Sequence, residues 1–416
     1  MSLVGVRPDH DTSRPAGAAA ALRTTTAVRE RAQYLLNRAR AGDSLWFSVD
    51  DDSMPAAAAQ VADVTRARYP DLRIPYHSRW RHFEAGGMDR KAGLDSRLAA
   101  EDTPARARAM IDLAVVSVLL DAGAGPDWHY LEATTGQRFS RSEGLGVASW
   151  HAFCGGVFSS DAAHPLQVDA AGLRNLSAER LAEVFQCAPA NPLVGLEARV
   201  MVLRLLGDAL ASQPEVFGSQ GRPGGLFDLR DATRIAAHDI LSQILASLSG
   251  IWLAANSIGH EALGDCWRHD AVPGSGLTNG WVPFHKLSQW LTYSLLEPFE
   301  WAGVHVEGLD ALTGLPEYRN GGLLLDAGVI VPRDANFAQQ AVKPGDTWTI
   351  EWRALTVSLL DELAPQVRTL LRVDDAAFPL ACLLEGGTWA AGRAIAAERR
   401  EGGLPPVVVA SDGTVF

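Results

Sequence analysis

The chain has 416 residues, of which 47% are hydrophobic and 21% are charged, as is typical of globular proteins with one large domain or two to three smaller ones. Its net charge of −12 and its pI of about 5.4 argue against a general binder of nucleic acid or anionic membranes, because either would need a basic surface. A local basic pocket for one small anion stays compatible with this charge. The four cysteines lie far apart and form no CxxC pair, so they indicate neither a disulfide framework nor a thiolate metal site.

The N-terminal stretch 1–22 is rich in Ala, Arg and Pro but has no continuous apolar core. It therefore lacks the pattern of a secretory signal, and we expect a flexible segment in a cytoplasmic protein. The most apolar helix candidates, near 110–120 and 244–255, are short and carry or adjoin polar residues. They fit buried helices better than membrane spans.

Helical periodicity dominates the rest of the chain. Thr26 is placed to cap a helix that runs to Ala41 and stops at Gly42, and Ser53 is placed to cap another that ends near Tyr69. Further helices are predicted at 104–121, 177–186, 193–211, 231–254, 284–302, 352–371 and 387–400. Strand candidates are few: 44–49, 322–331 with a turn at 326–328, 347–351 and 407–410. The sequence thus predicts a mainly α, compact multi-helix fold with a few short strands.

The glycine-rich segment 216–227 is the best candidate for a soft domain boundary. It would separate an N-terminal helical part, 23–215, from a C-terminal part with short strands, 228–416. The segment is neither long nor biased enough to be a disordered linker, so one continuous globular unit is the alternative.

The run HSRWRHFEAGG at 77–87 concentrates charged and aromatic side chains just before a glycine pair. If 77–84 is helical, His77, Arg81 and Glu84 share one face. One interpretation is a cationic and aromatic clamp for a phosphorylated or planar ligand, with Glu84 positioning a guanidinium or moving a proton. The other is a helix with buried aromatics and surface ion pairs. The crowding of polar by large apolar residues favours the first.

A polar stripe crosses the otherwise apolar helix predicted at 284–302. Lys286, Gln289 and Tyr293 follow one another at helical spacing, and Glu297 lies one turn further along the same side. A stripe that faces a ligand and a ladder of internal hydrogen bonds explain this pattern equally well.

Glu351 and Arg353 stand at the entry to another buried helix, where an ion pair that fixes the helix end is the favoured interpretation. His260, His269 and His285 do not have the spacing of a standard metal site. No dinucleotide fingerprint, Walker A, HExxH or GxSxG motif is present. The sequence therefore predicts no metal and no cofactor.

Several long motifs together resemble the uracil-catabolism family typified by the fungal fourth uracil-catabolism protein. They are HSRWRHFEAGG (77–87), LLDAGAGPDWHY (119–130), RSEGLGVASWHAF (141–153), FHKLSQWLTYSLLEP (284–298), EWRALTVSLLDEL (351–363) and SDGTVF (411–416). In the pathway of that family, uracil becomes a nucleotide, its ring is opened and urea is released. The resemblance implies a role in this pathway without assigning a catalytic step.

A more distant similarity is to the queuosine-nucleotide salvage glycohydrolases. It rests on VRERAQYLLNRA (28–39), His77, LLDA (119–122), TYSLLEP (292–298) and EWRALTVSLL (351–360). Those mostly helical proteins, likened to DNA glycosylases, cleave the N-glycosidic bond of a 5′-phosphorylated nucleoside. The similarity implies the same scaffold and the same kind of reaction.

The similarity aligns His77 with a ligand-binding histidine of that family and Tyr293 with the tyrosine of a catalytic Asp-Tyr pair. Thr292 stands where the family has the aspartate, and the family's Asn-Phe-Cys-Phe-Trp loop reads differently at 123–128. Asp127 offers a replacement carboxylate from that loop.

Cleavage of an N-glycosidic bond passes through an oxocarbenium-like state, which needs a nearby anion, an acid at the leaving nitrogen, a positioned water and a grip on phosphate. We expect Asp127 or Glu84 to be the catalytic carboxylate. The expected substrate-binding residues are His77, Arg79, Arg81, Trp128, Lys286, Gln289, Tyr293, Glu297, Glu351 and Arg353; of these Arg79, Arg81 or Lys286 would hold phosphate, and Trp128 and Tyr293 would wall the leaving group.

Both resemblances point to a hydrolase that converts ribosylurea 5′-phosphate to urea and ribose 5-phosphate. One alternative is an amidohydrolase or deaminase of an opened pyrimidine nucleotide, with groups around 260–270 as base or metal ligands. Another is a non-catalytic protein that binds an intermediate. A functional link to the ring-opening enzyme of the pathway is expected, and partners such as nucleic acid or membranes are not.

Overall fold

The computed structural model describes residues 10–253, 256–334, 336 and 341–410. Within them lie helices α1 to α17 and short strands β1 to β10. The helices are α1 (Pro15–Leu22), α2 (Thr25–Ala41), α3 (Met54–Arg68), α4 (Trp80–Phe83), α5 (Arg90–Arg97), α6 (Thr103–Leu119), α7 (Arg141–Cys154), α8 (Ala170–Arg174), α9 (Ala178–Val184), α10 (Leu196–Ala211), α11 (Pro214–Phe217), α12 (Ala237–Leu248), α13 (Lys286–Trp301), α14 (Tyr318–Asp326), α15 (Thr347–Leu371), α16 (Leu380–Leu383) and α17 (Trp389–Arg399). The strands are β1 (Phe47–Val49), β2 (His129–Glu132), β3 (Gln137–Ser140), β4 (Arg234–Ala236), β5 (Ser257–Ile258), β6 (Glu261–Ala262), β7 (Cys266–Arg268), β8 (Trp281–Pro283), β9 (His305–Glu307) and β10 (Ile330–Pro332).

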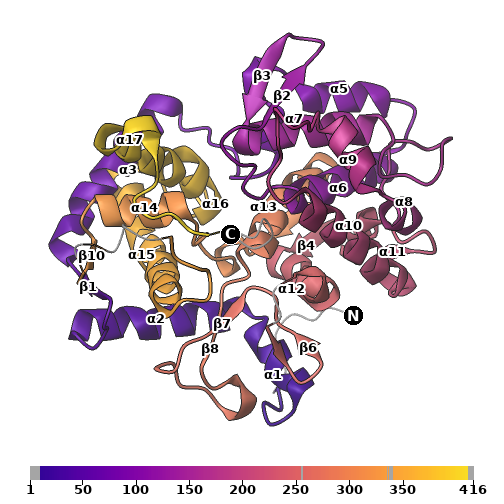
Figure 1. Cartoon of the computed structure of the whole chain (residues 1–416). Helices are drawn as coiled ribbons and strands as arrows, with labels where there is room; N and C mark the ends of the chain where they lie inside the picture. Colours follow the sequence, from indigo (N-terminus) through magenta and orange to yellow (C-terminus); the bar gives the residue numbers. More distant parts are fainter. Residues whose placement is uncertain (1–9, 254–255, 335, 337–340, 411–416) are drawn as a thin grey trace.

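The helices form two groups with α13 between them (Figure 1). One group contains α2, α3 and α14 to α17, and the other contains α5 to α12. The strands pair only in two-stranded sheets, of which β4 with β9 is parallel and the others are antiparallel. The prediction of a mainly α fold with a few short strands is confirmed.

One large hydrophobic cluster runs from Val28 to Val407 and includes residues from both sides of the expected boundary at 216–227. The early helices α2 and α3 pack on the late helix α15, so the two halves of the sequence are interleaved in space. A smaller cluster joins α1 to the strands β5 to β8. The stretch 15–22, expected to be flexible, is the helix α1, and 1–9 lie outside the described residues.

Two segments predicted as strands are wholly or partly helical, although the end of the predicted 322–331 does belong to the strand β10. Glu317 caps α14 by accepting the N–H groups of Arg319 and Asn320 at 2.7 and 2.6 Å, which starts a helix where 322–331 suggested a strand. Likewise 347–351 is the first turn of α15. At 407–410 only an isolated bridge of Val409 with Val342 forms, whereas the hairpin β2–β3 was not predicted.

The start of α13 is held by a distant residue. His285 precedes the helix with a left-handed φ of 49°, and its ring Nε2 lies 3.0 Å from the carbonyl oxygen of Leu22. The carboxylate of Asp265 accepts the N–H of Lys286 at 3.0 Å, which satisfies one of the orphan donors of the first turn. These two contacts hold the first turn of α13 in place, and they thereby fix the direction in which its polar side chains face.

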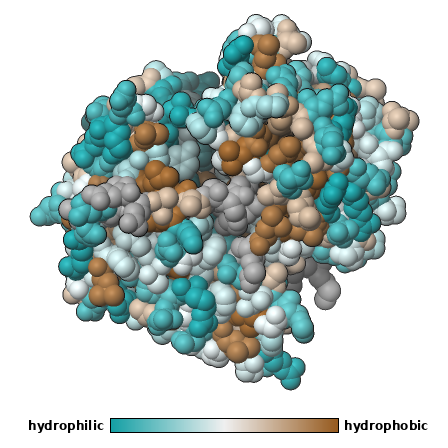
Figure 2. Space-filling model, viewed as in Figure 1, coloured by the Kyte–Doolittle hydropathy of each residue, from teal (hydrophilic) through white to brown (hydrophobic). Residues whose placement is uncertain are grey.

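Among the described helices, none is both long and apolar enough to cross a membrane. Figure 2 shows hydrophilic side chains over most of the visible face, with hydrophobic ones gathered along the line where the two groups of helices meet.

Candidate functional site

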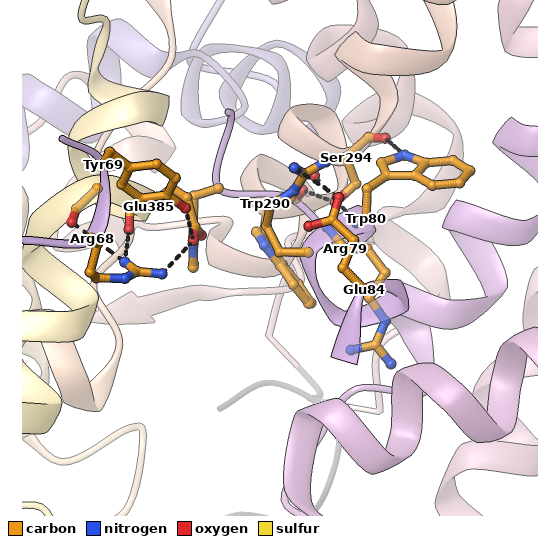
Figure 3. A network of polar contacts seen from close by, with 12 residues as sticks. Arg68, Tyr69, Arg79, Trp80, Glu84, Trp290, Ser294 and Glu385 are labelled. Carbon is orange, nitrogen blue, oxygen red and sulfur yellow. Dashed lines mark hydrogen bonds and ion pairs between the residues drawn. The ribbon is translucent and has the colours of Figure 1, made fainter. Parts of the chain in front are cut away.

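The 77–87 run is anchored on α13 (Figure 3). Ser294 accepts the backbone N–H of Arg79 on its hydroxyl and the indole N–H of Trp80 on its carbonyl, both at 2.9 Å. The helix α4 begins only at Trp80, so His77 precedes it and does not share a helical face with Glu84.

His77 is held by a carboxylate from the far end of the chain. Its Nδ1 lies 2.9 Å from Oε2 of Glu385. The other carboxylate oxygen, Oε1, accepts hydrogen bonds from Arg68 at 2.9 Å and from the hydroxyl of Tyr69 at 3.1 Å. Burial alone would raise the pKa of Glu385, but the hydrogen bond and charge of His77 and the charge of Arg68 lower it to about 2. Glu385 lies in a π-helical turn, Leu384–Thr388, a feature frequent at functional sites.

Trp290 lies between the two networks of Figure 3. Its ring is 6.4 Å from that of His77, 5.7 Å from that of His82 and 5.7 Å from the guanidinium carbon of Arg79. Burial and the charge of Arg79 lower the pKa of His82 well below its usual value. Within the described part of the chain, Trp290 Nε1 and His82 Nδ1 are buried without a hydrogen-bond partner.

Arg79 is fully buried and points at Asp121, the last residue before the 122–128 loop. Its Nε donates to the hydroxyl of Ser117 at 2.6 Å, and its Nη1 lies 3.1 Å from Asp121 Oδ2. In the described structure neither Arg79 Nη2 nor Asp121 Oδ1 has a hydrogen-bond partner. Arg199 fixes the loop by donating to the carbonyls of Ala122 and Gly123, at 2.9 and 3.2 Å. A buried ion pair with one free donor and one free acceptor is thus held in place.

A second carboxylate, Glu317, faces the same region from α14. Burial raises its pKa, and the two N–H groups that it accepts, with the charges of Lys286 and His77, oppose that rise only in part. Lys286 is half-buried, and burial with the charge of Arg353 lowers its pKa. The charges of Glu317 and Asp121 thus both act on Lys286, and we group these three residues as a composite candidate site.

The polar side chains along α13 differ in how many of their hydrogen-bonding groups have partners. Tyr293 donates its hydroxyl to the Thr313 carbonyl at 2.8 Å, and Gln289 accepts the Thr313 N–H at 3.3 Å. Gln289 Nε2 has no partner among the described residues. Tyr293 therefore belongs to an internal ladder of hydrogen bonds, while a ligand-facing role stays a prediction for Gln289, whose amide nitrogen is free.

Arg81, Glu84 and Glu297 form a separate ion-pair network. Arg81 lies 2.7 Å from Glu297 and 3.0 Å from Glu84, so both carboxylates compete for its charge. The Glu84 side chain is 52% exposed, and burial raises its pKa moderately. Burial raises the pKa of Glu297 to about 7, against the charge of Arg81 and a hydrogen bond from Ser78.

The structure places Asp127 and Trp128 away from the composite site. The Asp127 side chain is exposed on the loop. Trp128 is fully buried, donates its indole N–H to the Phe185 carbonyl at 3.0 Å and stacks on that ring. Trp128 is thus a core residue of the second helical group.

Glu351 and Arg353 are buried, and each forms an ion pair or hydrogen bond with a different residue. Arg353 binds both oxygens of Asp265 at 2.7 Å, and Glu351 lies 3.0 Å from the ring of His269. The favoured interpretation, an ion pair that fixes the end of a buried helix, agrees with the pair that Arg353 forms with Asp265. His260 is exposed, and no group of three or more His, Cys, Asp or Glu among the described residues is placed to hold a metal ion.

Asp121, Glu317, Asn320 and Glu385 were absent from the sequence-based site. Asp121 had a usable signal, because it lies in the LLDA motif on which both resemblances rest. Glu385 reaches the site through its contact with His77, 308 residues away in the sequence. Local spacing carries no such information.

Comparison with known proteins gives the family. The family described as "Protein of unknown function (DUF1688)" matches residues 21–416. Protein urg3 of Schizosaccharomyces pombe is 38% identical over 94% of this chain and 96% of its own length. Uracil catabolism protein 4 of Lachancea kluyveri is 38% identical over 82% of this chain and 85% of its own length. The family expected from the sequence motifs is confirmed, and the chain belongs to the DUF1688 family together with these relatives.

Proposed function

We propose that the chain is an enzyme of uracil catabolism that hydrolyses the N-glycosidic bond of a ring-opened uridine nucleotide. The substrate class is ribosylurea 5′-phosphate, and the products are urea and ribose 5-phosphate. The pathway is supported by the name of the relative from Lachancea kluyveri. The reaction is supported by the chemistry of the site and by the resemblance to queuosine-nucleotide salvage glycohydrolases.

The observation that carries the proposal is a pair of dissimilar, half-buried carboxylates, Asp121 and Glu317, whose charges both act on Lys286. Asp121 pairs with Arg79 and keeps one oxygen free, whereas both oxygens of Glu317 accept backbone N–H groups and burial raises its pKa. Two titratable groups in different environments are the usual basis for separate acid and base roles. Glycoside cleavage needs this division of labour.

In the proposed reaction Asp121 stabilises the positive charge that develops on the ribose and orients the attacking water. Glu317 gives its proton to the leaving nitrogen of urea, and the proton of the attacking water returns to the carboxylates. The bond from the ribose carbon to nitrogen breaks as the bond to the water oxygen forms. Asp121 thus takes the role that the sequence suggested for Asp127 or Glu84.

The phosphate is assigned to Lys286 and to the free Nη2 of Arg79. Lys286 lies at the first position of α13, where the helix dipole also favours an anion. The second candidate from the sequence, Arg81, already faces two carboxylates. His77 completes the wall of the site, because its charge acts on Glu317 and its ring lies against Trp290.

The test compares hydrolysis of ribosylurea 5′-phosphate with that of ribosylurea lacking the phosphate and of uridine 5′-phosphate. We expect urea only from the opened compounds, and kcat/KM lower by at least about 100-fold without the phosphate, because several charge-assisted hydrogen bonds are lost. Release of ammonia instead of urea would favour the amidohydrolase alternative. Binding without turnover of any of them would favour the non-catalytic alternative.

A further inference from the structure

Two buried side-chain amides meet the same short segment, 313–315, from different helices. Gln289, on α13, is 1% exposed and accepts the backbone N–H of Thr313 at 3.3 Å. Asn320, on α14, is fully buried and donates its Nδ2 to the carbonyl of Leu315 at 3.0 Å. Each amide therefore uses one end to hold the segment.

These backbone contacts fix the orientation of both amides. A backbone N–H requires the oxygen of Gln289, and a backbone carbonyl requires the nitrogen of Asn320. The remaining ends are the NH₂ of Gln289 and the carbonyl oxygen of Asn320. Among the residues described, neither has a hydrogen-bond partner, and the hydroxyl of Thr313 between them has none either.

The amides lie one helical turn behind the proposed catalytic and phosphate groups. Gln289 follows Lys286 by three residues on α13, and Asn320 follows Glu317 by three residues on α14. Lys286 and Glu317 are half-buried, whereas both amides are buried. In both helices, therefore, the amide side chain is more buried than the charged side chain three residues before it.

Unpaired buried polar groups are costly, so a complementary ligand group is their natural explanation. A free donor and a free acceptor on two amides that hold the same short segment match a planar amide, whose carbonyl would accept from Gln289 and whose N–H would donate to Asn320. A flat apolar ring would leave both unpaired. An ordered water is the competing occupant.

We propose that Gln289 and Asn320, assisted by the Thr313 hydroxyl, bind the ureido end of the substrate and so determine specificity for the leaving group. This inference rests on the proposed function for the identity of the substrate. It assigns recognition of the ureido group to residues that take no part in proton transfer.

Calorimetric binding to protein carrying Asp121→Asn, in which turnover is expected to be strongly slowed, tests the assignment. The ligands are ribosylurea 5′-phosphate and ribose 5-phosphate, which differ only in the ureido group. The decisive variant is Gln289→Glu, because it keeps the acceptor for the Thr313 N–H and removes the free donor. We expect it to weaken binding of ribosylurea 5′-phosphate by about 10- to 100-fold and binding of ribose 5-phosphate by less than about threefold.

Thr313→Val is the second variant, since it removes a hydroxyl without a described partner and leaves the backbone contacts in place. We expect a loss of about three- to tenfold for the ureido ligand alone. Tyr293→Phe is the matched control, because it loosens the same segment through the Thr313 carbonyl without touching the free groups. Its effect on the two ligands should be equal.

Equal losses for both ligands in Gln289→Glu, or a loss in Tyr293→Phe as selective as that in Gln289→Glu, would overturn the inference in favour of a structural role. Unchanged binding in Gln289→Glu and Thr313→Val would overturn it in favour of an ordered water only. If ureido-selective binding is found while unmodified protein releases no urea, the ureido site stands and the proposed hydrolysis fails.

Discussion

Two buried Asp–Arg pairs flank the start of α13, and they differ in how far their hydrogen bonds are completed. Asp265 receives both guanidinium nitrogens of Arg353 at 2.7 Å and the N–H of Lys286 at 3.0 Å. Asp121 receives Arg79 on one oxygen at 3.1 Å, and its other oxygen has no partner in the described chain. Both pairs carry the same charges, and both arginines are almost fully buried. The candidate site is therefore distinguished by side-chain donors and acceptors that have no hydrogen-bond partner, and not by the burial of charge.

The electrostatics of Asp265 agree with a completed structural pair. Burial would raise its pKa, but the charge and hydrogen bonds of Arg353, with the N–H of Lys286, lower it to about 2. Asp265 therefore stays ionised and bound at neutral pH, and it holds α13 in place. The pair of Asp121 with Arg79 instead keeps one hydrogen-bond donor and one acceptor that a ligand could use.

The sharpest test of this contrast exchanges one carboxylate for its amide on the same loop. Asp121→Asn should lower kcat for urea release by about 10²- to 10⁴-fold, because the anion beside the developing positive charge is lost. Asp127→Asn, at an exposed position of that loop, should change kcat by less than about twofold. Comparable losses in both variants would remove the distinction between the two aspartates.

Breaking the completed pair should affect stability instead. Arg353→Met leaves Asp265 buried without its partner and should lower the free energy of unfolding by about 3–5 kcal/mol. Chemical denaturation measures this loss, and the double variant Asp265→Leu with Arg353→Met should recover part of it. A stable Arg353→Met protein that has lost ligand binding would instead make Arg353 a binding residue.

The position of α14 should be sensitive to a single methyl group. A Cβ on Gly321 would lie 2.7 Å from the ring of Trp352, so Gly321→Ala should cost about 1–3 kcal/mol of stability. Gly93→Ala is the control, since its Cβ would meet Trp150 at an ordinary 3.4 Å and replace a glycine inside α5. Thermal unfolding should show Gly93→Ala neutral or more stable by about 0.5–1 kcal/mol.

The last prediction concerns Glu297, a buried carboxylate that contacts Arg81 and Ser78. Burial raises its pKa from 4.5 to about 7 in the folded protein, so its protonated form favours folding below pH 4.5. This contribution is lost as the pH rises from about 4.5 to about 7. The unfolding free energy of the unmodified protein, relative to Glu297→Gln, should therefore fall across that window and level off above it. A difference independent of pH would contradict the raised pKa.

Long periodic helices could be predicted from the sequence, because their stop signals are local. The helix α2 ends at Ala41 before Gly42, whose φ is 85°, as its pattern indicated. The helix α14 could not, since its Leu- and Gly-rich run resembles a strand and its cap, Glu317, precedes the apolar residues. Gly321 serves close packing on Trp352, which a single sequence does not reveal.

The candidate site was predicted in outline only. The stripe of α13 and the buried Arg79 lie where the motifs pointed, since each resides in one compact segment. The sequence pointed to Asp127 rather than Asp121 because the choice depends on the path of the loop. Arg199 holds that loop through contacts that span 77 and 76 residues. Glu385 depends on a contact with His77, 308 residues away in the sequence, which only the folded chain displays.

The proposed glycosidic cleavage is tested most directly by following one atom. Ribosylurea 5′-phosphate labelled with ¹³C in the ureido carbon is incubated with the purified protein and observed by NMR. The account predicts that the label appears in urea, in step with an equal amount of ribose 5-phosphate. Appearance of the label in bicarbonate with release of ammonia, or persistence of the substrate signal, would contradict it.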